Sequence, residues 1–192
     1  MNMRTRGFTL IELLIALAIF AFLIMLAGPM YADFMGNSQI RNAAENTLTG
    51  VRLAQTHAVR NNRPAKFFIN PSAAGGWAVF LFDENTGDFA TAAVDTYSWT
   101  EGAAKTSVTV VPDRATQVSF DGLGRICTKV LCTPSGADTL PIQQINVTNT
   151  NVSNPRPLRV AISTPDTNGT RPGTKLCDPD PGVATTDPRH CP

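Results

Sequence analysis

Glu12 has the most unusual chemical setting of any residue in this 192-residue chain. It is the single carboxylate in an otherwise apolar run from Phe8 to Ala27. A run of about 20 residues forms a helix roughly 30 Å long, which matches the hydrocarbon thickness of a bilayer. A carboxylate in such surroundings is costly unless a positive group neutralises it. An ionisable residue in such a position is usually paired or functional.

Four cysteines form the second set of chemically distinctive residues: Cys127, Cys132, Cys177 and Cys191. If the part of the chain after the apolar run is exported, they lie in an oxidising compartment, where disulfides persist. Four cysteines allow three pairings. We favour Cys127–Cys132 and Cys177–Cys191, since each closes a short local loop. A zinc site is the weaker alternative, because the spacing does not fit a zinc ribbon and only His57 and His190 could add ligands.

The remaining residues show no catalytic pattern. Both histidines lie at positions typical of an exposed helix or tail, and no Ser/His/Asp or Cys/His arrangement accompanies them. The Gly122–Arg125 segment lacks the third glycine and the following helix of a dinucleotide-binding loop. We therefore expect a protein that is not an enzyme and that uses no metal or cofactor.

The apolar run itself allows three interpretations. Arg4 and Arg6 are the only charges ahead of it, so the N-terminus should stay cytoplasmic. The residues that follow the apolar run should then lie on the opposite side of the membrane. A removable secretory signal needs small residues at a cleavage site, and Met25-Leu26-Ala27 fits that pattern poorly. A plain membrane anchor gives no reason for Glu12.

The third interpretation comes from the segment Gly7-Phe8-Thr9-Leu10-Ile11-Glu12, which resembles the processing site of type IV pilins and type II secretion pseudopilins. The resemblance implies that a prepilin peptidase cleaves between Gly7 and Phe8, removes residues 1–7, and leaves Phe8 to be N-methylated. Glu12 then becomes the fifth residue of the mature chain. Its carboxylate would pair with the Phe8 amine of a neighbouring subunit and set the register between them.

The helix is expected to continue through residues 30–63 after an interruption and kink at Gly28 and Pro29, because a proline removes a helical hydrogen bond. Small and apolar residues then recur at steps of four and three, which places them on one face that should pack on a sheet: Ile40, Ala44, Thr47, Val51, Ala54 and Ala58. The opposite side carries Arg41, Glu45, Arg52 and Gln55. The Asn61-Asn62-Arg63-Pro64 segment should end the helix, since the residue before a proline avoids helical geometry.

The rest of the chain, residues 64–192, predicts a β-rich head and hence an α+β fold. Strands are expected at 65–69, 77–82, 107–111, 117–120, 144–148 and 157–163, and the first two should form a hairpin. The Asp121–Arg125 segment reads as a turn whose glycines can supply positive backbone angles. Beyond Asn149 the composition disfavours a packed core, so only a Cys177–Cys191 loop would hold the end of the chain.

Two further segments, Arg52–Arg60 and Ser119–Arg125, resemble the FimT/GspH group of minor pilins and minor pseudopilins. The resemblance is strong over residues 4–60, fair to residue 125 and thin afterwards. It implies a pilin-like fold and a minor pilin that primes assembly of a type IV pilus. Its partners would be other pilins, the prepilin peptidase and the inner-membrane assembly platform. Before assembly the chain would be anchored in the bacterial inner membrane with a periplasmic head. The alternative is a minor pseudopilin of a type II secretion system.

DNA binding is the other alternative function. The net charge is +1, or near −1 once Arg4 and Arg6 are lost, so only a local patch could bind nucleic acid. The cations Arg52, Arg60, Arg63 and Lys66 are explained more simply by the dipole at a helix C-terminus. Some FimT-type pilins bind DNA during natural transformation through a Gly-Arg-x-Arg motif in a C-terminal loop. This tail lacks that motif and offers Arg171, Lys175 and Arg189, diluted by aspartates.

Overall fold

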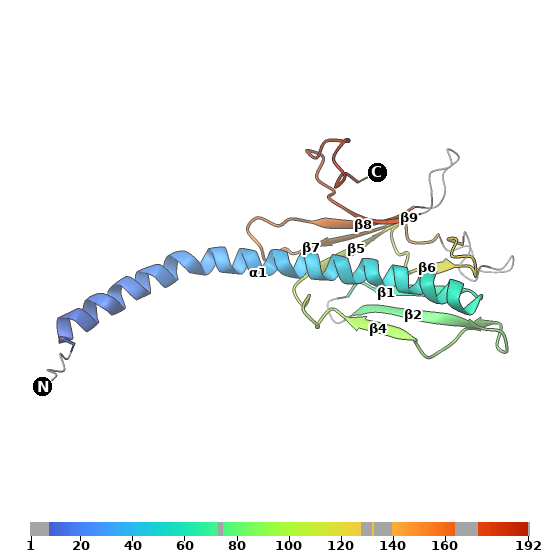
Figure 1. Ribbon diagram of the computed structural model, residues 1–192, viewed down its shortest axis with the longest axis horizontal. Helices are drawn as coiled ribbons and strands as arrows, with labels where there is room; N and C mark the ends of the chain where they lie inside the picture. Colours follow the sequence, from blue (N-terminus) through green and yellow to red (C-terminus); the bar gives the residue numbers. More distant parts are fainter. Residues whose placement is uncertain (1–7, 73–74, 128–131, 133–139, 164–172, 192) are drawn as a thin grey trace, which may run out of the picture.

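The computed structural model describes residues 8–72, 75–127, 132, 140–163 and 173–191. Within these ranges a long helix, α1 (Leu10–Asn61), is followed by nine strands in two antiparallel sheets. The front half of α1 projects away from the head, and its back half lies along both sheets (Figure 1). The expected α+β architecture, a long helix packed on an antiparallel head, is confirmed.

The first sheet follows the hairpin that the sequence predicts. Its strands are β1 (Ala65–Asn70), β2 (Gly76–Asp83), β3 (Asp88–Phe89), β4 (Asp95–Ser98) and β6 (Gln117–Phe120). β1 lies between β2 and β6, and β3 and β4 both pair with the other edge of β2. The hairpin register runs from Ala65 opposite Leu81 to Asn70 opposite Gly76. This register places Phe67, Ile69, Trp77 and Val79 on the buried face.

The second sheet has the order β5-β7-β8-β9 and contains β5 (Ser107–Val111), β7 (Gln144–Thr148), β8 (Leu158–Ser163) and β9 (Gly173–Cys177). β8 begins one residue later than expected. β9 contradicts the expectation that only a disulfide holds the tail, because its five residues pair with β8 along its length. β3, β4 and β9 were not predicted, since short polar strands carry little apolar periodicity.

The predicted buried face of α1 is confirmed. All six of its residues have no exposed surface, and they pack against both sheets through side chains such as Phe67, Trp99, Ile145 and Val160. Thr47 fits this apolar contact because its hydroxyl donates a hydrogen bond to the carbonyl oxygen of Ala43, 2.7 Å away. Gly50 lies against the rings of Trp77 and Phe67, where a Cβ atom would come within 2.8 Å of both.

Helix α1 ends at the predicted segment but is not interrupted where the sequence predicts. Asn62 ends the helix in a left-handed conformation (φ 49°), and its N–H donates to the carbonyl oxygens of Ala58 and Val59. The expected interruption at Gly28 and Pro29 is wrong, because α1 runs through both positions. Its projecting half is curved rather than broken (Figure 1).

The side of α1 opposite the core is only partly solvent-facing. Arg41 forms an exposed ion pair with Glu45, with 2.8 Å between Nε and Oε1. Gln55, expected on this side, instead donates from Nε2 to the carbonyl oxygen of Gly124, 2.8 Å away. The turn at Asp121–Arg125 therefore docks on the helix end. Of its two glycines, Gly124 has a positive φ (77°).

Candidate processing and assembly site

The projecting end of α1 begins with a capping box that involves Glu12. Thr9, in extended geometry, accepts a hydrogen bond at its hydroxyl oxygen from the backbone N–H of Glu12 (3.3 Å). The Glu12 carboxylate accepts a longer bond from the backbone N–H of Thr9 (3.5 Å). These bonds satisfy N–H groups that lack partners in the first turn, and the helix accordingly starts at Leu10 rather than Phe8. The Thr-x-x-Glu spacing is a recognisable capping signature that the sequence interpretation missed.

The capping box gives Glu12 a favourable position before any neighbour arrives. Its carboxylate lies at a helix N-terminus, where the macrodipole and the free N–H groups favour negative charge. Phe8 precedes the helix and is 86 % exposed. Gly7, the other residue of the expected cleavage site, lies outside the described part of the chain.

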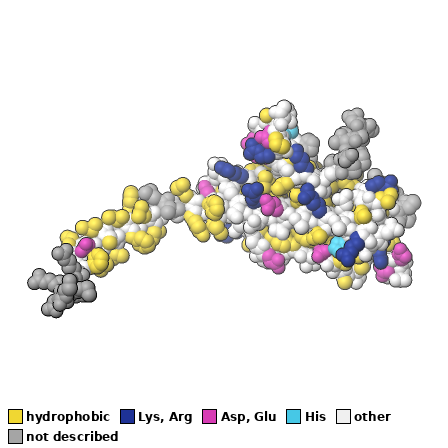
Figure 2. All heavy atoms as spheres, in the orientation of Figure 1, with side chains coloured by type: hydrophobic (Ala, Val, Ile, Leu, Met, Phe, Trp, Pro, Cys, Tyr) yellow, Lys and Arg dark blue, Asp and Glu magenta, His cyan; other side chains and the backbone are white. Residues whose placement is uncertain are grey.

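The helix that follows Glu12 exposes an apolar surface along its front half. The large apolar side chains from Leu10 to Met25 are all more than half exposed, and Figure 2 shows hydrophobic atoms along this projection. By length and composition α1 could cross a membrane. Such a surface is not stable in water, so lipid or the helices of other subunits must cover it.

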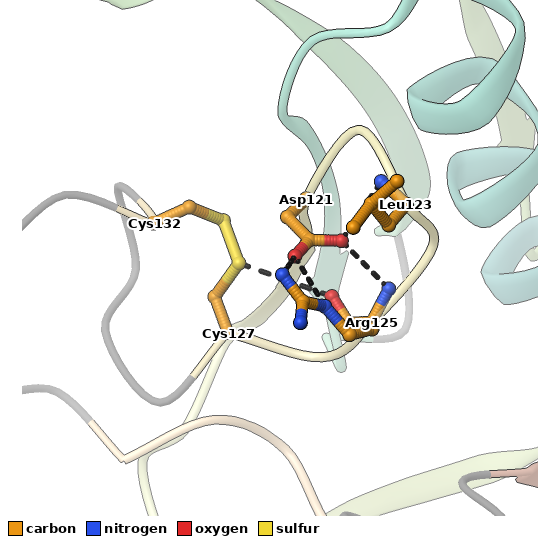
Figure 3. The surroundings of a disulfide bond; sticks show 5 residues. All are labelled: Asp121, Leu123, Arg125, Cys127 and Cys132. Carbon is orange, nitrogen blue, oxygen red and sulfur yellow. Dashed lines mark hydrogen bonds and ion pairs between the residues drawn. A yellow bond between two sulfur atoms is a disulfide. The ribbon is translucent and has the colours of Figure 1, made fainter.

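Both favoured cysteine pairs are disulfide-bonded in the structure. Cys127–Cys132 and Cys177–Cys191 have Sγ–Sγ distances of 2.00 and 2.08 Å. Cys127 lies just beyond the Asp121–Arg125 turn (Figure 3). The second bridge is buried beside Ala161 of β8. No group of three potential metal ligands occurs within the described ranges.

The tail cations proposed for DNA binding are engaged where the structure describes them. Arg171 lies outside the described residues. The amine of Lys175 donates to the carbonyl oxygen of His190, 2.8 Å away. Arg189 forms a two-pronged pair with Asp187 at 2.8 and 3.2 Å, and its hydrogen bonds lower the pKa of Asp187 to about 2. Arg189 therefore has a carboxylate partner already.

The expected cation cluster at the end of α1 is also divided. Lys66 is not part of this cluster, because its amine lies over the rings of Phe80 and Phe89, 5.0 and 4.7 Å from their centroids. Burial lowers the pKa of Lys66, and the nearby charge of Asp88 partly opposes that shift. Arg60 remains exposed at the last helical turn, as the dipole explanation requires.

The two histidines are not the exposed groups that the sequence suggested. Nε2 of His57 lies 2.7 Å from Oδ2 of Asp95, and its side chain is 23 % exposed. This contact joins α1 to the first residue of β4. Nδ1 of His190 lies 3.1 Å from the carbonyl oxygen of Val183. Both rings connect segments of the head, which is a structural role.

Two family models together match most of the chain. Residues 2–28 match the family model of the prokaryotic N-terminal methylation motif, and residues 43–167 match that of the type II transport protein GspH. Among solved structures, the chain is similar to the type IV minor pilin FimU of Pseudomonas aeruginosa. The two share 14 % sequence identity over 67 % of this chain and 86 % of the other, with a TM-score of 0.44. No curated protein sequence matches the chain.

Proposed function

Because the chain belongs to the GspH family of type IV minor pilins and pseudopilins, we propose that it is a minor pilin that enters a type IV pilus and primes its assembly. The observation that carries the proposal is the projecting helix. It joins a methylation motif to an apolar surface that the head leaves uncovered. Such a helix suits two environments, the bilayer before assembly and the packed core of a filament afterwards.

We further propose the order of events before assembly. A prepilin peptidase removes residues 1–7 and exposes the amine of Phe8. The chain waits in the inner membrane with its N-terminus cytoplasmic and its head periplasmic, in line with Arg4 and Arg6 preceding the apolar run. An assembly platform then moves the subunit into the filament.

In the proposed assembly step, Glu12 exchanges one partner for another. Its bond to the Thr9 N–H is long at 3.5 Å, so the carboxylate is available to a stronger donor. The Phe8 amine of a neighbouring subunit supplies a full positive charge, and a charged pair in apolar surroundings bonds more strongly than a neutral donor does. The pairing would define the axial register between subunits.

Replacing Glu12 with Ala tests the assembly role. We expect cleavage after Gly7 to persist but surface pili to fall at least about tenfold, because one charge of the buried pair is left alone and such a loss costs several kcal/mol. Glu45→Ala is the matched control, since the Glu45 carboxylate pairs with Arg41 on the exposed face of the helix. Pili counted by electron microscopy and protein levels measured by immunoblot provide the readouts. Normal piliation in Glu12→Ala would refute the proposal.

A second candidate function is a minor pseudopilin of a type II secretion system, which the description of the matching family favours. Deleting the chain distinguishes the two functions. Loss of surface pili with normal protein secretion supports the pilin, and the reverse supports the pseudopilin. We do not propose DNA binding, because Arg189 is paired with Asp187 and Lys175 is bound to His190.

A further inference from the structure

A groove of about 830 Å3 lies where the projecting half of α1 meets the head. We call it the neck groove. It lies between the middle of α1 and the region formed by β8, β9 and the C-terminal segment. Its lining combines three large apolar residues with three arginines: Phe34, Leu158, Leu176, Arg41, Arg156 and Arg189. Figure 2 shows Lys and Arg side chains gathered over this part of the molecule.

The wall of the neck groove is a fixed structure. It is the segment between β7 and β8, residues 149–157, which is bonded to α1 at two side chains. Oδ1 of Asp33 accepts from the backbone N–H of Ser153 at 2.9 Å. Asn37 donates to the carbonyl oxygen of Asn154 (3.2 Å) and accepts from the N–H of Arg156 (2.8 Å). These bonds hold the backbone of Arg156 against the helix.

Close packing supports the same wall. Val152 is buried against Gly36, so close that a Cβ at position 36 would clash with Cγ2 of Val152. A side chain there would push the segment away from α1. The neck groove is therefore preformed and does not depend on a ligand to shape it.

Arg156 is the arginine of the groove whose charge is available. Arg41 pairs with Glu45, and Arg189 pairs with Asp187. The exposed guanidinium of Arg156 forms no hydrogen bond or ion pair with another residue in the described ranges. An occupant that brings a carboxylate would find a cation here beside an apolar surface. Arginine next to apolar contacts is typical of protein interfaces.

The groove also continues the exposed apolar surface of the helix. Met30, Tyr31 and Phe34 are 77 %, 66 % and 70 % exposed, and Phe34 lines the groove itself. In a filament the front half of α1 packs on neighbouring subunits, so the surface next to it faces those subunits too. We propose that the neck groove binds a neighbouring pilin subunit, which inserts apolar side chains and pairs a carboxylate with Arg156. This inference rests on the proposed function.

A lipid headgroup fits the groove less well. Asn37, which holds Arg156, lies ten residues beyond Ala27, or about 15 Å along the helix. The polar layer of one leaflet is only roughly 5–8 Å thick. This position along the helix therefore favours a protein partner.

Site-specific photo-crosslinking of the full chain in the cells that assemble the filament tests this proposal. A photoreactive phenylalanine analogue replaces Phe34, and the same analogue at Leu123 is the control, because Leu123 is similarly exposed (71 %) on a distant turn. We expect position 34 to form at least about tenfold more adduct with a pilin subunit than position 123, with the adduct identified by mass spectrometry. Arg156→Glu should reduce that adduct about tenfold, whereas Arg114→Glu, at a 93 % exposed side chain, should not.

Three outcomes would overturn the proposal: an adduct with phospholipid only, equal pilin adducts at positions 34 and 123, or no effect of Arg156→Glu. The experiments distinguish failure of the groove proposal from failure of the proposed function. If the chain is cleaved and sediments with filaments but position 34 forms no pilin adduct, the groove proposal alone fails. If Glu12→Ala leaves piliation normal while position 34 still crosslinks to a pilin, the proposed function alone fails.

Discussion

At the scale of single residues, Asp121 shows how one carboxylate can shape a turn. Its Oδ1 accepts from the backbone N–H groups of Leu123 (3.0 Å) and Arg125 (2.9 Å), and its Oδ2 pairs with the Arg125 guanidinium at 2.8 Å (Figure 3). Partial burial opposes ionisation, but the hydrogen bonds from Arg125 and Leu123 outweigh it and lower the pKa of Asp121. The turn that docks on Gln55 is thus held by the charged form of Asp121.

This pKa shift predicts acid sensitivity. The pKa of Asp121 is lower in the folded chain than the ordinary value of 3.8, so its ionised form stabilises the fold above that value, and the contribution is lost as pH falls through the folded pKa. Asp121→Asn should lower the unfolding temperature at neutral pH. It should also make the unfolding temperature fall less steeply as the pH drops below about 4. Thermal unfolding followed by circular dichroism at several pH values measures both effects. Asp113→Asn, at a 98 % exposed side chain, should change neither; an identical pH profile for the two variants would contradict the prediction.

At the scale of elements, the back half of α1 depends on a small residue where it meets the hairpin of β1 and β2. A Cβ at position 50 would lie 2.7 Å from two ring atoms of Trp77 and 2.8 Å from the ring of Phe67. These rings pack against each other with centroids 6.0 Å apart, and Trp77 also stacks on Tyr97 of β4. Gly50 therefore sets the distance between the helix and the hairpin.

Gly50→Ala should destabilise the head although alanine favours helices. The helix gains about 1 kcal/mol from the substitution, but overpacking a core costs typically 1–3 kcal/mol, and the rings here lie in a fixed hairpin. We expect a lower unfolding temperature for the full chain in detergent. Gly28→Ala is the control, because a Cβ at Gly28 meets nothing within 4 Å. Equal or greater stability of Gly50→Ala would show that the rings move aside at little cost.

At the scale of the whole molecule, the C-terminal segment is an integral part of the head. β9 completes the second sheet, and its last residue, Cys177, is bonded to Cys191. Between them, Asp178 donates its N–H to the carbonyl oxygen of Arg189 (2.7 Å), so the segment folds back on itself. The same segment contributes Asp178 and Arg189 to the neck groove.

Removing the bridge between Cys177 and Cys191 should loosen this part first. A loop of about 15 residues gains about 3 kcal/mol from closure, so the Cys177→Ser/Cys191→Ser variant should unfold at a lower temperature. Limited proteolysis should cut it within residues 178–191 well before the unmodified chain. The control is Cys127→Ser/Cys132→Ser, whose bridge spans a sequence separation of 5 and should leave the C-terminal cleavage unchanged. Similar proteolysis of both variants would contradict a local role.

The sequence by itself determined the features that depend on neighbouring residues. Apolar periodicity located α1 and its buried face, proline and asparagine marked its end, and apolar runs located β1, β2, β5, β6, β7 and β8. The motif around Gly7 to Glu12 indicated the family for the same reason, since its chemistry lies within six residues.

Only the tertiary structure decided features whose partners are far apart in the chain. β9 is a strand because β8 offers it a free edge, and its own residues carry little apolar periodicity. Gln55 is bound to a turn 69 residues away, and Asn37 and Asp33 hold a segment more than a hundred residues later. Such contacts follow from how the two sheets pack around the helix, and no local pattern encodes that packing. The neck groove exists for the same reason.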